Sequence, residues 1–123
     1  MQSNPVRWFE IYVQDMSRAK AFYEGVLAVK LERLEGPDLE MQAFGMDPER
    51  AGTGGALVSV PGMPSGNNST LVYFACDDCA VEESRVEKYG GRVQRPKMSI
   101  GQYGFISLAI DPDGNMVGLH SLK

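Results

Sequence analysis

The sequence predicts an α+β fold in which a single domain, residues 1–123, holds two modules with the element order β-α-β-β-β. One observation is that a strand followed by a helix-capping aspartate occurs twice, with Asp15 and Asp78 lying 63 positions apart. Another is that residues 61–69, rich in Pro, Gly, Ser and Asn, divide the chain near its middle. Module one therefore covers about residues 5–60, residues 61–69 form a linker, and module two covers about 70–122.

The first module begins with a strand over residues 6–13, where β-branched and aromatic residues are frequent. Alternation places Trp8, Glu10 and Tyr12 on one face and the residues between them on the other. Asp15 then caps a helix over residues 16–27, whose apolar positions recur at helical spacing. Ala28 follows, where a glycine would fit a left-handed cap better. Short strands are expected at 29–34, 39–44 and 55–60.

The second module repeats this order with different residues. A strand is expected at 70–76, followed by a helix over 80–89 that is only weakly amphipathic and ends at Gly90-Gly91. Further strands are expected at 92–97, 103–110 and 115–122. The last two are joined by a turn at 111–114, where proline presets φ and Gly114 is free to adopt a positive φ.

Composition limits the function classes. Twelve basic against sixteen acidic residues give a formal charge of −4, so no nucleic-acid partner is expected. No apolar run approaches the ~18 residues of a membrane span, and no secretory signal is visible, so we expect a cytoplasmic protein without a membrane partner. The chain has one histidine, which excludes a His-rich zinc site.

The two cysteines form Cys76-Asp77-Asp78-Cys79, a spacing found in redox dithiols and in half of a zinc site. No second cysteine pair completes a zinc ribbon, and the two aspartates disfavour a thiolate. The alternative, which we favour, is a buried Cys76 at a strand end and Cys79 in the first turn of a helix.

These patterns resemble the vicinal oxygen chelate superfamily, which includes glyoxalase I, bleomycin-resistance proteins and extradiol dioxygenases. The resemblance rests on residues 13–23 (VQDMSRAKAFY), on 54–56 (GGA) and on 111–115 (DPDGN) before the final strand. It covers essentially the whole chain. It implies a glyoxalase/bleomycin-resistance/dioxygenase-like fold with a cavity in the cupped sheet.

The resemblance also implies four metal ligands, usually His, Gln or Glu, on the first and last strands of each module. In this chain the corresponding positions are Trp8, Gly55 (with an uncertainty reaching Val58), Leu71 and Gly118. None has a donor for a divalent cation. We therefore expect no cofactor, and a divalent metal is open but unsupported by these positions.

Without these metal ligands, the cavity that the resemblance implies is the candidate functional site. If Trp8 faces it, alternation brings aromatic and apolar side chains there with a few polar groups, as is usual for small-molecule sites. The residues expected to bind a ligand are Trp8, Tyr12, Leu71, Tyr73, Phe105, Ser107 and Met116.

Glu10 and His120 are the candidate catalytic residues. Burial among aromatics would raise the pKa of the Glu10 carboxyl and suit it to act as a general base. The alternative is that Glu10 pairs with an arginine or a backbone amide. His120 lies two positions beyond Gly118, as Glu10 lies two beyond Trp8, so the pair predicts an acid–base couple or a displaced two-ligand metal site, or else His120 is a rim residue.

Three functions are compatible with the sequence. The first is metal-independent binding of a small aromatic or hydrophobic molecule. The second is a lyase or isomerase related to lactoylglutathione lyase, with Glu10 as general base. The third is an interaction module with a filled pocket. A homodimer is expected in each case, because open sheet edges and aromatic faces are commonly buried by two-fold pairing.

Overall fold

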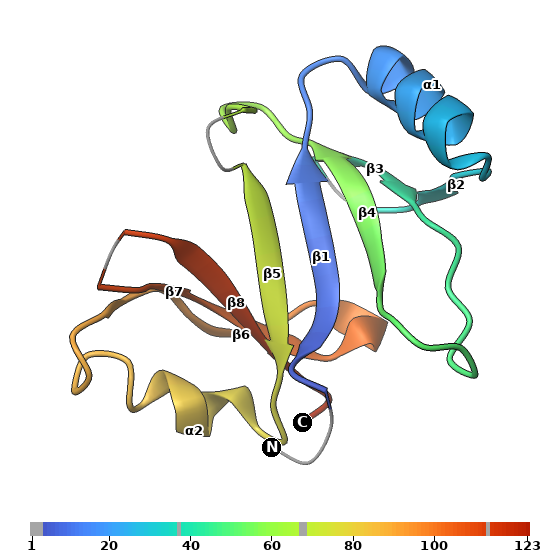
Figure 1. The fold of residues 1–123 in the computed structure, drawn as a ribbon. Helices are drawn as coiled ribbons and strands as arrows, with labels where there is room; N and C mark the ends of the chain where they lie inside the picture. Colours follow the sequence, from blue (N-terminus) through green and yellow to red (C-terminus); the bar gives the residue numbers. More distant parts are fainter. Residues whose placement is uncertain (1–3, 37, 67–68, 113) are drawn as a thin grey trace. The chain divides into compact units, whose positions relative to one another are not determined.

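A computed structural model describes residues 4–36, 38–66, 69–112 and 114–123. Its element order is the predicted one, β-α-β-β-β twice. The elements are β1 (Val6–Tyr12), α1 (Met16–Leu27), β2 (Glu32–Leu34), β3 (Glu40–Ala43), β4 (Gly54–Ser59), β5 (Thr70–Ala75), α2 (Cys79–Glu83), β6 (Arg92–Ser99), the 3-10 helix η1 (Gly101–Tyr103), β7 (Phe105–Ile110) and β8 (Met116–Ser121) (Figure 1).

The chain forms two compact units. The N-terminal module consists of residues 8–70, and the C-terminal module consists of residues 71–123 together with the chain up to Arg7. The first strand thus passes from one module into the other, since its first two residues belong to the C-terminal module.

In the N-terminal module the strand order is β2-β3-β4-β1. β1 and β4 run parallel, with Trp8 opposite Gly54 and Glu10 opposite Ala56, whereas β3 and β4 are antiparallel. The predicted alternation of β1 is confirmed. Ile11 packs toward α1 with Met16 and Leu57, while Trp8 and Tyr12 pack on the opposite face.

Helix α1 has the predicted bounds and cap. The Asp15 carboxylate accepts a hydrogen bond from the backbone N–H of Arg18 at 3.1 Å, and the helix ends at Ala28 with φ 54°. The expectation of a packed apolar stripe is only partly met, because Phe22, Val26 and Leu27 are more than half exposed. The residues of α1 that do pack, Met16, Ala19 and Tyr23, lie in its first two turns and contact a small cluster around Leu31 and Leu57.

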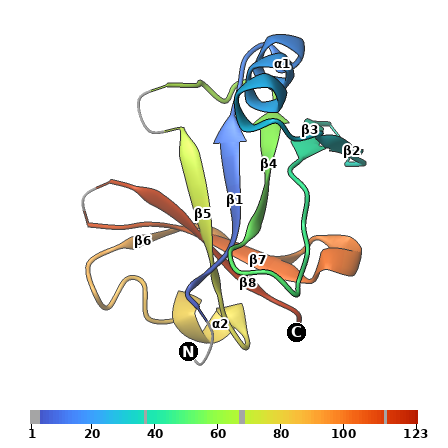
Figure 2. The same ribbon diagram turned by 45° about the vertical axis from the view of Figure 1, so that its right-hand side comes forward.

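In the C-terminal module the order is β5-β8-β7-β6 (Figure 2). β5 and β8 run parallel, and β7 is antiparallel to both of its neighbours. The carbonyl of Pro5 accepts a hydrogen bond from the N–H of Ala75 at 2.9 Å, which fastens the chain start to this module. The turn before β8 is also as predicted, since Gly114 has φ 90° and its N–H donates to the Asp111 carbonyl at 3.0 Å.

Helix α2 is shorter than the predicted 80–89. It spans Cys79–Glu83, and tight turns continue to Gly90. The apolar residues of this segment do not form a buried face, because Val81 and Tyr89 are 49% and 70% exposed, so packing does not hold a longer helix. None of the described helices is long and apolar enough to cross a bilayer.

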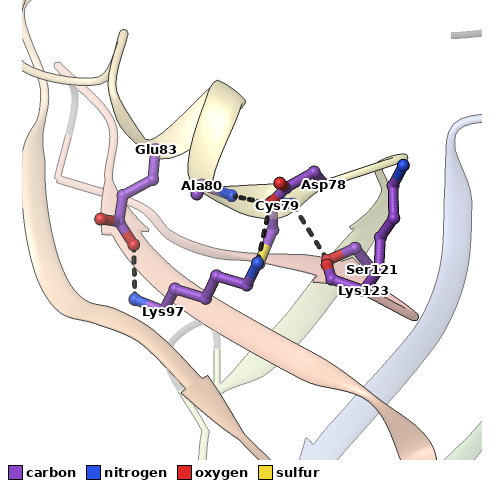
Figure 3. A network of polar contacts seen from close by, with 7 residues as sticks. All are labelled: Asp78, Cys79, Ala80, Glu83, Lys97, Ser121 and Lys123. Carbon is purple, nitrogen blue, oxygen red and sulfur yellow. Dashed lines mark hydrogen bonds and ion pairs between the residues drawn. The ribbon is translucent and has the colours of Figure 1, made fainter.

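A polar network fixes the start of α2 (Figure 3). The Asp78 carboxylate caps the helix through the N–H of Ala80 at 3.0 Å and pairs with Lys97 Nζ at 2.8 Å. This hydrogen bond from Lys97 lowers the pKa of Asp78 and raises that of Lys97. Lys97 also lies over the Phe105 ring, 4.8 Å from its centroid, and Ser121 Oγ accepts from the N–H of Cys79 at 3.0 Å. Strand β6 is thereby tied to the helix start.

Candidate functional site

Glu10 lies between two aromatic side chains of its own strand. The Tyr12 hydroxyl donates a hydrogen bond to Glu10 Oε1 at 2.8 Å, and the Trp8 indole N–H donates one to Glu10 Oε2 at 3.2 Å. Alternation in β1 brings all three side chains to one face of the sheet. Each carboxylate oxygen therefore has one neutral donor, and this arrangement differs from the arginine or backbone partner considered from the sequence.

Burial changes the protonation of this carboxyl group. Removal from water raises the pKa of Glu10, and the hydrogen bonds from Tyr12 and Trp8 oppose that rise without cancelling it. The direction is the one predicted from the sequence. A carboxyl group in this state is a stronger base than an exposed one, which is the property that a general base requires.

The sheet face around Glu10 is lined by small and apolar residues. Strand register continues from Glu10 through Ala56 and Ala43 to Glu32, so two alanines separate two carboxylates. Ala43 and Ala56 are buried, and the apolar side chains around them are larger. Those packed against the two alanines and Val58 are Trp8, Tyr12, Leu34 and Met41. We call this surface the Glu10 face.

Sequence reasoning did not assign Glu32 to the site. Its position follows from pairing with Ala43, and a three-residue strand carries too short an alternation to reveal its face.

The C-terminal module has a comparable face. Tyr73 pairs with Gly118 and Ala75 with His120, so Leu71, Tyr73 and the β8 positions 116, 118 and 120 lie on one side, as predicted. Leu71 and Tyr73 are buried, and Met116 is partly exposed. That this face and the Glu10 face form one ligand cavity stays a prediction.

The register of β7 shows that the face predicted for Phe105 and Ser107 is wrong. Leu108 pairs with Gly118 and Ile106 with His120, so these β7 residues share the face of Tyr73. Phe105 and Ser107 therefore lie on the opposite, α2 side. Phe105 packs on the cluster of Cys76, Cys79 and Leu119, and the buried Ser107 hydroxyl donates to the Arg95 carbonyl at 3.1 Å. Alternation groups residues by face, but only the register with a neighbour decides which face that is.

His120 is held by neighbours in its own module. Its Nε2 lies 2.6 Å from the carbonyl oxygen of Tyr103, and its Nδ1 lies 3.4 Å from Arg7 Nη1. Because a carbonyl accepts and a guanidinium donates, Nε2 serves as the donor and Nδ1 as the acceptor in this arrangement. His120 thus joins η1 to β8, which supports the rim role over the catalytic one.

The residues at the implied metal positions do not fit a metal ion. Register places Gly55 beside Phe9 on the α1 side, so Gly55 itself does not share the face of Trp8, whereas Val58, the limit of the uncertainty in this assignment, lies opposite Tyr12 on that face and has no donor for a metal. A Cβ on Gly55 would lie 2.4 Å from the Phe9 ring, and one on Gly118 would lie 2.2 Å from the Tyr73 ring. No ligand side chain has room at either position. Residues 4–36, 38–66, 69–112 and 114–123 contain no group of three or more His, Cys, Asp or Glu suited to a metal.

The cysteine pair has the arrangement favoured from the sequence. Cys76 follows β5, Cys79 begins α2, and both are buried and form no disulfide bond with each other. Burial, reinforced by the charge of Glu82, raises the pKa of Cys76 to about 11, so its thiolate is scarce at neutral pH.

A further hollow of about 330 Å³ lies in the N-terminal module, where β1 meets α1. Tyr12, Asp15 and Arg18 are among its lining residues. Asp15 is engaged as the helix cap, so the polar part of this hollow already serves the fold.

Solved structures of similar fold were found for nearly the whole chain. A hypothetical protein from Bacillus halodurans C-125 superposes with a TM-score of 0.75 at 12% identity, covering 99% of this chain and 96% of that one. Methylmalonyl-CoA epimerase from Streptomyces coelicolor gives a TM-score of 0.71 at 13% identity, with 96% of each chain covered. The epimerase from Mycobacterium tuberculosis gives 0.69 at 14% identity, covering 100% and 93%. At these identities the likeness shows the fold alone.

Among curated proteins, the putative glyoxylase CFP32 of Mycobacterium tuberculosis (strain CDC 1551 / Oshkosh) is 28% identical over 117 residues. The match covers 91% of this chain and 43% of the relative, so the chain spans less than half the length of that protein. The same match is found in Mycobacterium bovis.

The family model described as Glyoxalase/Bleomycin resistance protein/Dioxygenase superfamily matches residues 6–119. This range contains every helix and nearly every strand residue described above. The resemblance inferred from the sequence motifs and the paired β-α-β-β-β plan are thereby confirmed. The chain belongs to the Glyoxalase/Bleomycin resistance protein/Dioxygenase superfamily.

Proposed function

We propose that this protein binds a small hydrophobic or aromatic molecule on the Glu10 face, without the four metal ligands of its catalytic relatives. The observation that carries the proposal is the carboxylate of Glu10 set between the Trp8 indole and the Tyr12 phenol. Aromatic side chains, apolar surroundings and one oriented polar group are the usual parts of a small-molecule site.

The metal positions support the same proposal. Trp8 and Leu71 carry no donor for a divalent cation, and aromatic rings fill the space beside Gly55 and Gly118. The affinity is therefore proposed to come from apolar burial, ring stacking and Glu10, which require no cofactor.

Trp8 is the single tryptophan of the chain, so its emission reports on this face selectively. Titration with the neutral probe N-phenyl-1-naphthylamine should quench Trp8 emission saturably at one probe per chain. Trp8→Ala should weaken probe binding by roughly tenfold or more, because an aromatic contact of this size contributes on the order of 1–2 kcal/mol. Because Trp8→Ala has no tryptophan emission, the fluorescence of the probe itself measures its affinity for this variant.

Phe22→Ala provides the matched control. Phe22 is a 58% exposed aromatic side chain on α1, away from the Glu10 face, and its removal should leave the probe affinity unchanged. If Phe22→Ala weakened binding while Trp8→Ala did not, the probe would be binding to the exposed helix and the proposal would be wrong. Absence of saturable binding would favour the third reading, an interaction module with a filled pocket.

A lyase or isomerase with Glu10 as general base is the second candidate, favoured by the raised pKa of this carboxyl group. The fold is shared with methylmalonyl-CoA epimerases, and the curated relatives are named as putative glyoxylases. Each name suggests a proton transfer at carbon as the reaction class to test.

Deuterium uptake from D₂O into methylmalonyl-CoA, and isomerisation of the methylglyoxal–glutathione adduct, test this candidate. A base must be ionised, so the rate should fall as the pH falls through the raised pKa of Glu10. Glu10→Gln should lower the rate by roughly a hundredfold or more. An unchanged rate in this variant, or no turnover of either substrate, would reject the enzymatic reading and leave the binding proposal standing.

A further inference from the structure

We propose that the preferred ligand of the Glu10 face is a hydrophobic organic cation, such as a quaternary or protonated amine carried on an aromatic or aliphatic body. This inference rests on the proposed function and narrows it from hydrophobic molecules in general to one charge class.

The first argument is the charge of the face. Among the described residues, the four salt bridges join other pairs, and none of them includes Glu10 or Glu32. The strand residues that alternate onto this face in the N-terminal module include no Lys, Arg or His. Arg33 neighbours Glu32 in sequence, but alternation turns it to the other face, where it pairs with Glu35 at 3.7 Å. Glu10 and Glu32 therefore lie on the same face of the sheet, and the strand residues on that face of this module include no basic side chain to pair with them.

The second argument is the nature of the partners of Glu10. Trp8 and Tyr12 each donate one hydrogen bond, but both side chains are neutral and leave the carboxylate charge uncompensated. Partial burial strengthens the attraction of that charge for a cation, since water screens it less. An anionic ligand would be repelled by the same carboxylate.

The third argument is the aromatic character of the same two residues. Indole and phenol rings attract cations through their quadrupole, and tryptophan does so most strongly. The surroundings of the two rings are apolar, since Ala43 and Ala56 are buried and Leu34 and Met41 pack against them. Ring attraction, a carboxylate and these apolar surroundings together favour a bulky, weakly hydrated cation over a compact, strongly hydrated one such as Na⁺.

Two probes of the same shape separate charge from hydrophobicity. Benzyltrimethylammonium and neopentylbenzene differ in having N⁺ or carbon at the branching atom. Titration calorimetry at low ionic strength should show the cation binding roughly tenfold or more tightly than its neutral isostere. Phenylacetate, an anion, should bind more weakly than both.

Glu10→Gln, which keeps the size of the side chain but removes its charge, should abolish most of the preference for benzyltrimethylammonium over neopentylbenzene. Glu40→Gln is the matched control, because Glu40 is exposed and alternates onto the α1 side, so the same charge change should not alter the preference.

Equal binding of the two isosteres, or a preference that survives in Glu10→Gln, would overturn the inference while the proposed function would stand on the neutral probe. Binding of neither isostere to the wild-type protein would contradict both. Loss of the preference in Glu40→Gln to the same extent as in Glu10→Gln would show a general effect of net charge and would also overturn the inference.

Discussion

Gly104→Ala should lower the free energy of unfolding by about 3 kcal/mol or more, which is a large part of the total for a domain of this size. Gly104 has φ 102° and ψ −131°, a conformation open almost only to glycine. An added Cβ would lie 2.3 Å from the carbonyl oxygen of Ser121, and that backbone atom cannot move aside without disturbing the end of β8. Urea denaturation followed by circular dichroism measures the loss.

Gly101→Ala separates the cost of a positive φ from the cost of the clash with the Ser121 carbonyl. Gly101 also has a positive φ of 79°, but a Cβ there would have no atom within 4 Å. This variant should cost only about 1 kcal/mol, the strain of a left-handed conformation alone. If the two variants were equally stable, close packing against Ser121 would not be the reason for glycine at position 104.

Gly118→Glu, which introduces a residue type that the metal-dependent relatives use as a ligand, should destabilise the C-terminal module by about 3 kcal/mol or more. The added Cβ would lie 2.2 Å from the Tyr73 ring, and the carboxylate would enter the face on which Tyr73 is buried. The melting temperature and the urea midpoint should both fall. Position 118 therefore cannot become a metal ligand by one substitution.

The Tyr73 ring causes the clash with a side chain at position 118, and a double-mutant cycle tests this assignment. Gly118→Ala combined with Tyr73→Leu should be clearly more stable than the sum of the two single effects, because the shorter side chain makes room for the new methyl group. Gly45→Glu is the control, since no atom lies within 4 Å of a Cβ at Gly45. Strict additivity in the cycle would show that the ring of Tyr73 does not cause the clash.

Local signals in the sequence were sufficient for most of the fold. Asp15 and Asp78 cap their helices as predicted, because a cap depends on a side chain and a backbone N–H two or three positions away. Helix α2 was predicted too long because its end depends on tertiary burial, and Val81 and Tyr89 are left exposed. Propensity alone does not extend a helix whose apolar residues find no partner.

The site was predictable to the extent that it lies on one strand. Trp8, Glu10 and Tyr12 were grouped correctly because alternation within β1 suffices for that. Phe105 and Ser107 were assigned to the wrong face, since the phase of β7 depends on its pairing with β8. Glu32 was missed for the same reason, as its place follows only from a pairing with Ala43. Hydrogen bonds between strands, which no local pattern specifies, decide these assignments.

The path of the first strand has a consequence for how the chain acquires its structure. Residues up to Arg7 belong to the C-terminal module, where the Pro5 carbonyl bonds to Ala75 and Arg7 contacts His120. Both partners, Ala75 and His120, lie far along the chain from the residues that they contact and are synthesised later. Completion of the C-terminal module therefore depends on contacts of high sequence separation, which are the slow ones to form during folding.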